Sequence, residues 1–212
     1  ETGAQYFINH VSNDFAVSDF INDVFVINEG FTNIFEFSQK VLGVYSTGAF
    51  EGEKWGAKLG VRVENTDLST FLVNTSESNN RNFTNLFPSA ATSYKFSDRF
   101  SMQAGYSRRI FRPRLWDLNP FFNIRNNFNI RAGNPDLLPE FTDVYEVSSI
   151  HIFEKTSINL SVYHQYTTDV VDRITFFEDN VSITTPLNIG VRKTTGLEIN
   201  GKYTPSKWLS FN

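Results

Sequence analysis

Apolar and polar residues alternate along most of this chain, with the period of two that is typical of β-strands. The clearest run is Lys54–Glu64, where one face carries Trp55, Ala57, Leu59, Val61 and Val63. Similar alternation runs through 100–107, 157–162 and 191–200, and less cleanly through 33–50 and 141–153. Helical periodicity is nearly absent. The pattern predicts an all-β protein built from antiparallel strands.

The connections between these strands fall into two classes. Short polar breaks lie at 51–53, 97–98, 154–155 and 204–207, and long connections at about 12–32, 66–84, 112–139 and 168–186. Because antiparallel neighbours reverse direction, this strict alternation puts all short turns at one end of the sheet and all long loops at the other. Outer-membrane barrels show this asymmetry, with short periplasmic turns and long extracellular loops. A soluble sandwich has no reason to sort its loops in this way.

Strand length and aromatic placement favour the same interpretation. The strands run roughly ten residues or more, whereas soluble strands average about 5–6 and membrane-crossing strands about 9–11. The short-turn ends collect aromatic residues: Phe50, Trp55, Phe96, Phe100, Phe153, Tyr203 and Trp208. An interfacial girdle explains this gathering, although β-strands are generally rich in aromatics. We therefore predict an antiparallel transmembrane β-barrel, with about eight full strands here and a ninth beginning at Trp208. The alternation leaves open which face lines the lumen.

Composition excludes several classes of function. The net charge of −4 gives no reason to expect nucleic acid, and the absence of Cys excludes a disulfide scaffold or a Cys-ligated metal. The three His residues share no metal-ligand spacing, and no catalytic motif is present, so we expect no metal, no cofactor and no enzymatic activity. The first residues, ETGAQYFINH, do not form a signal peptide, and both ends read as mid-strand. We expect residues 1–212 to be part of a single larger barrel domain, with the signal peptide outside this chain.

The connection 112–139 is unusually stiff and rich in arginine. Its prolines, Pro113, Pro120, Pro135 and Pro139, fix their own φ angles and restrict the residues before them. Asn134-Pro135-Asp136 predicts a turn, and Glu140 would begin the returning strand. Such stiffness would let the loop hold its shape without a core of its own.

Arginine is the only basic residue type within 108–131: Arg108, Arg109, Arg112, Arg114, Arg125 and Arg131. Their planar donor forks suit carboxylates and phosphates. Three partners stay open: carboxylates of Asp117, Asp136, Glu140 or a plug; lipopolysaccharide phosphates at the rim; or an anionic ligand. Trp116, Phe121 and Phe122 are expected to pack under the loop rather than form a sugar-stacking platform.

Several segments resemble one known family. The block SYKFSDRFSMQAGYSRRIFRPRLWDLNPF, followed by GNPDLLPEFTDVYEV, is similar to the barrel of TonB-dependent outer-membrane receptors of the outer-membrane β-barrel family. LFPSAATSYKF, SVYHQYTTDVVDRI and NIGVRKTTGLEINGKY resemble neighbouring strands of that family. The resemblance covers Phe83 to the end, and Asn33–Asn65 more loosely.

The resemblance implies a barrel of about 22 strands with a plugged lumen in the cell outer membrane. It also implies a plug domain, which we expect to lie outside residues 1–212. It implies uptake of an extracellular small ligand of the siderophore, vitamin, glycan or peptide class, and as partners outer-membrane lipid and lipopolysaccharide, the receptor's own plug domain and the TonB complex. The matching motif residues would be structural or ligand-facing: Arg109, Arg112, Pro113, Trp116, Asn119, Pro120, Asn134, Pro135, Pro139 and Glu140. The alternatives are another outer-membrane barrel, such as a passive pore or adhesin, and a secreted glycan-binding sandwich.

Overall fold

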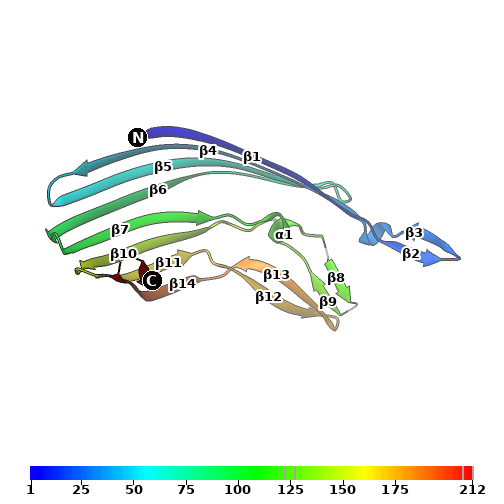
Figure 1. Cartoon of the computed structure of the whole chain (residues 1–212). Coiled ribbons are helices and arrows are strands. Elements are labelled where there is room, and N and C mark those ends of the chain that lie inside the picture. The colour runs from blue at the N-terminus through cyan, green and yellow to red at the C-terminus, as the bar shows by residue number, and fades with distance from the viewer. Residues whose placement is uncertain (122, 127, 207, 212) are drawn as a thin grey trace.

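The computed structural model describes residues 1–121, 123–126, 128–206 and 208–211, with the backbone alone described for 123–126. Its main body is a nine-stranded antiparallel sheet, in the order β1-β4-β5-β6-β7-β10-β11-β14-β15, which curves as an open barrel wall (Figure 1). Its strands are β1 (Thr2–Phe15), β4 (Asn33–Glu51), β5 (Trp55–Leu72), β6 (Glu77–Ser97), β7 (Phe100–Phe111), β10 (Glu140–Ile152), β11 (Thr156–Thr168), β14 (Val191–Ser206) and β15 (Leu209–Phe211). The prediction of an all-β antiparallel barrel is confirmed, and the ninth strand begins one residue after Trp208.

The two ends of the sheet differ as expected, with tight turns at the left end of Figure 1 and elaborate connections at the right. The first connection carries the hairpin β2 (Ser18–Ile21) and β3 (Val24–Ile27) and the short helix η1 (Glu29–Phe31). The connection after β7 carries α1 (Leu115–Leu118), β8 (Asn123–Asn126) and β9 (Asn129–Arg131), and the one after β11 carries β12 (Val171–Glu178) and β13 (Val181–Asn188). These last four strands form a small sheet in the order β12-β13-β9-β8. The described part of the chain has no helix long and apolar enough to cross a membrane.

The long connection predicted at 66–84 is wrong. β5 continues to Leu72 and β6 starts at Glu77, so the two strands form a tall hairpin with a four-residue turn, 73–76. The error arises because outward residues of this hairpin are polar: the Asn65 amide donates to Asn82 Oδ1 at 3.0 Å and to Thr84 Oγ1 at 2.9 Å. Polar outward residues on a continuing strand imply that the hairpin rises beyond the apolar band of the wall.

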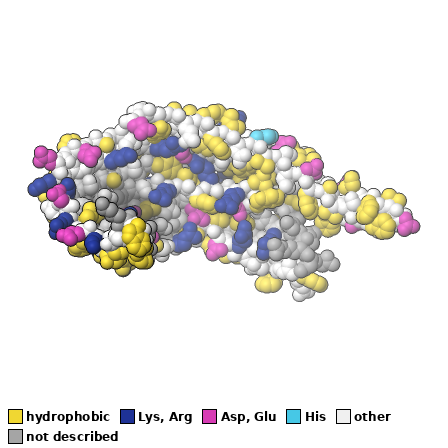
Figure 2. Space-filling model, in the orientation of Figure 1, with side chains coloured by type: hydrophobic (Ala, Val, Ile, Leu, Met, Phe, Trp, Pro, Cys, Tyr) yellow, Lys and Arg dark blue, Asp and Glu magenta, His cyan; other side chains and the backbone are white. Residues whose placement is uncertain are grey.

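The structure also decides which face of the sheet lines the lumen. The connection 112–139 packs on the face that carries Phe35 and Leu68, so this face is the inner one. The opposite face exposes large apolar side chains along every full strand, such as Leu59 at 66 % and Leu197 at 64 %. Figure 2 shows hydrophobic side chains in patches on the visible surface and on the projecting β2–β3 hairpin. An outward apolar face suits lipid contact.

Three of the seven predicted girdle residues, Trp55, Phe96 and Phe100, belong to a chain of ring contacts at the short-turn end. Rings from four neighbouring strands contact one another in a chain: Trp55 with Tyr94 at 4.6 Å, Tyr94 with Phe96 at 4.6 Å, Phe96 with Phe100 at 4.9 Å, and Phe100 with His151 at 4.8 Å. Amphipathic and aromatic rings are enriched where a barrel wall meets the membrane–water interface. The chain of rings therefore marks the lower boundary of the lipid-facing band.

Candidate functional site at the long-connection end

The connection 112–139 folds back onto the inner wall and shares a hydrophobic core with it. Leu118 of α1 and Leu137 are 0 % and 2 % exposed, and they pack against the inner-face cluster of Phe35, Phe37, Leu68 and Leu72. Leu115, Phe121 and Val171 pack at its margin. The loop does not need a core of its own, because alternating apolar residues at the tops of β4 and β5 share theirs with it.

Backbone contacts join the two halves of this connection. The Gly133 N–H donates to the Asn119 carbonyl at 2.7 Å, and the Asn134 N–H donates to the Asp117 carbonyl at 2.7 Å. A Cβ on Gly133 would lie 2.5 Å from the Asn119 oxygen and 2.8 Å from the Asp117 oxygen. The GNPD turn and the end of α1 thus approach so closely that only glycine fits at 133.

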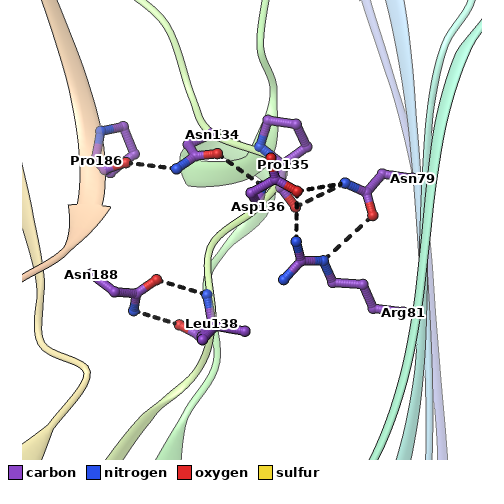
Figure 3. Close-up of polar contacts among 8 residues, drawn as sticks. All are labelled: Asn79, Arg81, Asn134, Pro135, Asp136, Leu138, Pro186 and Asn188. Atoms are coloured by element: carbon purple, nitrogen blue, oxygen red, sulfur yellow. Dashed lines mark hydrogen bonds and ion pairs between the residues drawn. The ribbon is translucent and has the colours of Figure 1, made fainter.

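Side chains of the same motif reach to neighbouring elements (Figure 3). The Asn134 amide donates to the Pro186 carbonyl of β13 at 3.2 Å and accepts from the Asp136 N–H at 2.9 Å, which confirms the predicted turn. Asp136 forms an ion pair with Arg81 of β6 at 2.6 Å. Asn188 holds the Leu138 backbone through two hydrogen bonds of 2.8 and 2.9 Å. We call Gly133–Glu140 with these contacts the clasp, since it ties the connection to both sides.

Glu140 ends the clasp and begins β10, as predicted. It is 7 % exposed, and its carboxylate accepts from the Val171 N–H at 2.9 Å and from Arg192 at 3.1 Å. One buried carboxylate therefore joins the starts of β10, β12 and β14. Because a buried carboxylate is costly unless it is paired, these two contacts offset the cost of burying Glu140.

Arg112 plays the matching role at the start of the connection. Its guanidinium donates to Glu64 Oε2 at 2.5 Å and to Thr66 Oγ1 at 3.2 Å, both on the inner face of β5. Arg62 binds the other oxygen of Glu64 at 2.5 Å. The two arginines neutralise a carboxylate whose side chain is 10 % exposed.

The remaining candidate residues range from buried to exposed. Pro113 and Pro139 are buried, Pro120 and Pro135 are half-buried, and Arg109 is exposed on the inner side. Trp116 is 67 % exposed, so the prediction that it packs under the loop is wrong, whereas Phe121 does pack there. Phe122 and the side chain of Arg125 lie outside the described residues.

The carboxylates expected to bind arginines do so, but their partners come from other elements. Asp117 pairs with Arg173 at 3.2 Å, Asp136 with Arg81, and Glu140 with Arg192. The sequence did not predict these arginines or Asn188 as site residues, because their neighbouring residues do not indicate which side chains they contact on other strands. The described residues contain no group of three or more side chains that could hold a metal ion.

A pocket of about 400 Å³ lies between the clasp, β13 and the tops of β1 and β4. Arg131, Arg173, Asp117 and the exposed Trp116 contribute to its lining, together with Asn33. Asn33 is 1 % exposed, and its side-chain oxygen and nitrogen have no hydrogen-bond partner in the described structure. The pocket can accept a molecule with acceptor oxygens, since its arginines outnumber its carboxylates.

An open, curved antiparallel sheet with an apolar outer face, a girdle at the short-turn end and structured connections at the other is the wall of an outer-membrane β-barrel. The chain belongs to the outer membrane protein beta-barrel family, whose model matches residues 1–212. Its location is therefore the cell outer membrane. No curated protein matches the sequence significantly.

Several solved barrels share this fold. The copper transporter OprC is 14 % identical with a TM-score of 0.68, over 97 % of this chain and 33 % of its own length. The hemophore receptor HasR of Serratia marcescens, in complex with its hemophore HasA and heme, is 10 % identical with a TM-score of 0.68, over 95 % and 38 %. The ferric yersiniabactin uptake receptor FyuA from Yersinia pestis is 12 % identical with a TM-score of 0.66, over 97 % and 30 %. The chain thus spans about a third of the length of these proteins.

Proposed function

We propose that this chain forms part of the barrel wall and the extracellular mouth of a TonB-dependent receptor that imports a scarce small ligand. The observation that carries the proposal is the clasp: the connection 112–139 is packed on the inner wall and fixed to β6 and β13 instead of extending into solvent. A fixed mouth with a lined pocket suits selective capture. An open pore needs neither.

The mechanism divides between this chain and parts outside it. Residues 1–212 supply one part of a single barrel domain, and the pocket with Arg131 and Arg173 faces the ligand as it enters. A plug domain within the barrel would complete the binding site, and the TonB complex would drive the plug's movement. Copper, heme with its hemophore, and ferric yersiniabactin are the ligands named for the structural neighbours. They support uptake as the class of function, but they do not identify the ligand of this protein.

The same observations argue against catalysis. The structural neighbours are transport receptors. Ser161 and His164 lie on opposite faces of β11, since Ser161 contacts Glu146 and His164 contacts Thr195, so they do not form a nucleophile and base pair. A passive pore remains the second candidate function. It would need no energy from the TonB complex, whereas the proposed receptor would.

Uptake by intact cells tests the proposal. A strain lacking the complete gene is compared with one carrying it, across media in which iron, copper, cobalamin, glycans or peptides limit growth in turn. We expect the gene to restore growth in one medium, and the restoration to vanish when TonB is deleted. Growth that survives loss of TonB, together with steady conductance of the purified protein in planar bilayers, would establish a pore instead.

A further inference from the structure

A row of polar side chains crosses the outer face of the wall near its extracellular end. Strand register sets Arg108 of β7 opposite Asp143 of β10, Asp143 opposite Tyr166 of β11, and Tyr166 opposite Lys193 of β14. Directly opposed residues in antiparallel strands share a face. Lys193 shares the outward face with Leu197 and follows the same alternation, so the whole row points away from the lumen.

The height of this row can be worked out along β14. Lys193 and the girdle residue Tyr203 are ten positions apart on the same face. At a rise of about 3.4 Å per residue and a strand tilt of about 40°, they are separated by about 26 Å along the membrane normal. The lipid-facing band of such barrels is about 25 Å tall. The row therefore lies where the outer leaflet's hydrocarbon ends and its headgroups begin.

The side chains below the row agree with this placement. The next row toward the membrane centre joins Tyr106, Tyr145 and His164, with the two Tyr rings 5.1 Å apart, as in an upper aromatic girdle. The row beneath that one is apolar, with Ala104, Val147, Val162 and Leu197 in register. Polarity thus rises in the order expected across a membrane interface.

The two cations of the row lie on aromatic rings and lack carboxylate partners. The Arg108 guanidinium lies 5.1 Å from the centre of the Phe141 ring, and the Lys193 ammonium 5.5 Å from the Tyr166 ring. Neither forms an ion pair with another described residue, and Asp143 accepts the Tyr106 hydroxyl at 2.8 Å. Ring contacts position a cation without consuming its N–H donors, so both remain available to an acceptor outside the protein.

We propose that Arg108 and Lys193 bind the phosphates of a lipopolysaccharide molecule in the outer leaflet. Phosphate oxygens are strong acceptors for both side chains, and the membrane places such a headgroup at the height of this row. Three strand spacings separate the two cations, which makes about 14 Å, so a headgroup with two phosphates engages both. This site is independent of the ligand that the receptor imports.

Titration of the delipidated full-length receptor in detergent with purified lipopolysaccharide tests the site. Each basic residue near an anionic lipid contributes about fivefold, so R108Q/K193Q should bind about 25-fold more weakly. The control K58Q/K202Q removes the same charge from the inner face, where Lys58 and Lys202 lie, and should bind like the wild type. Equal weakening in both variants, or none in either, would overturn the proposal.

A second titration needs no variant. Lipopolysaccharide from which the phosphates have been removed should bind the wild-type receptor at least 25-fold more weakly than the intact lipid. Equal binding of the two lipids would overturn the proposal, even if R108Q/K193Q failed to fold. Growth on the imported ligand is a separate readout, so failure of the uptake proposal would leave these binding results interpretable.

Discussion

Replacing Gly133 with alanine should open the clasp. The added methyl would lie 2.5 and 2.7 Å from the Asn119 oxygen and nitrogen and 2.8 Å from the Asp117 oxygen. All three atoms belong to the backbone, so relief requires that the turn and the end of α1 move apart. Overpacking of this kind costs about 1–3 kcal/mol. Separation also lengthens the two 2.7 Å hydrogen bonds from Gly133 and Asn134, each contributing about 1 kcal/mol.

If lengthening costs about half of each bond, the total loss is about 2–4 kcal/mol, which raises the population of the open connection by about 30- to 1,000-fold. Hydrogen exchange of the full-length protein, followed by mass spectrometry over peptides from 115–137, measures that population. The control is Gly48→Ala, since a Cβ at Gly48 of β4 meets nothing within 4 Å. If G133A exchanged in 115–137 at the wild-type rate, the close approach would not hold the connection, and the account of the clasp would be wrong.

Three further substitutions test other parts of the wall. Glu140→Gln keeps an acceptor for the Val171 N–H but removes the charge facing Arg192. Because the Arg192 side chain is 57 % exposed, water screens this ion pair, and the free energy of unfolding in urea should fall by only about 0.5–1 kcal/mol. A loss above 3 kcal/mol would contradict this screening. Arg112→Met leaves Glu64 with one arginine and should cost about 1.5–3 kcal/mol in the same assay, and an unchanged midpoint would show that the contact is not needed. Leu59→Arg places a charge on the lipid face and should reduce stability in lipid vesicles by about 2–4 kcal/mol, whereas a neutral effect would place Leu59 away from lipid.

The wall could be predicted from the sequence because lipid and lumen impose opposite demands on alternate residues. Leu59, Val61 and Val63 are apolar on one face while Lys58 and Arg62 are polar on the other, which is visible without any partner strand. The prediction failed where this contrast reverses. Above the membrane Asn65 and Asp67 face water. Leu68 points inward to a core that is completed by Leu118 and Leu137 of the connection 112–139. Apolar and polar residues still alternate there, but the apolar residues now face inward and the polar ones outward, so the pattern does not read as a continuation of the same strand.

The candidate site could be predicted only in part. Proline and asparagine determine local geometry, so the Asn134 turn and the start of β10 at Glu140 follow from neighbouring residues. The partners of these residues lie far along the chain: Arg192 is 52 positions from Glu140, and Arg81 is 55 from Asp136. Such pairs depend on register and on the path of each connection, which no single strand pattern contains.

The connections at the mouth therefore differ in how they are held. The connection 112–139 contributes Leu118 and Leu137 to the core of the wall and is fixed by paired carboxylates at both ends, so it behaves as part of the barrel. All eight strand residues of the β2–β3 hairpin are exposed, and the hairpin projects from the sheet at the far right of Figure 1. Elements with few buried contacts open at the lowest free energy. A barrel mouth built in this way holds the pocket where Phe121 packs against the core of the wall, and leaves movement to the outlying hairpin.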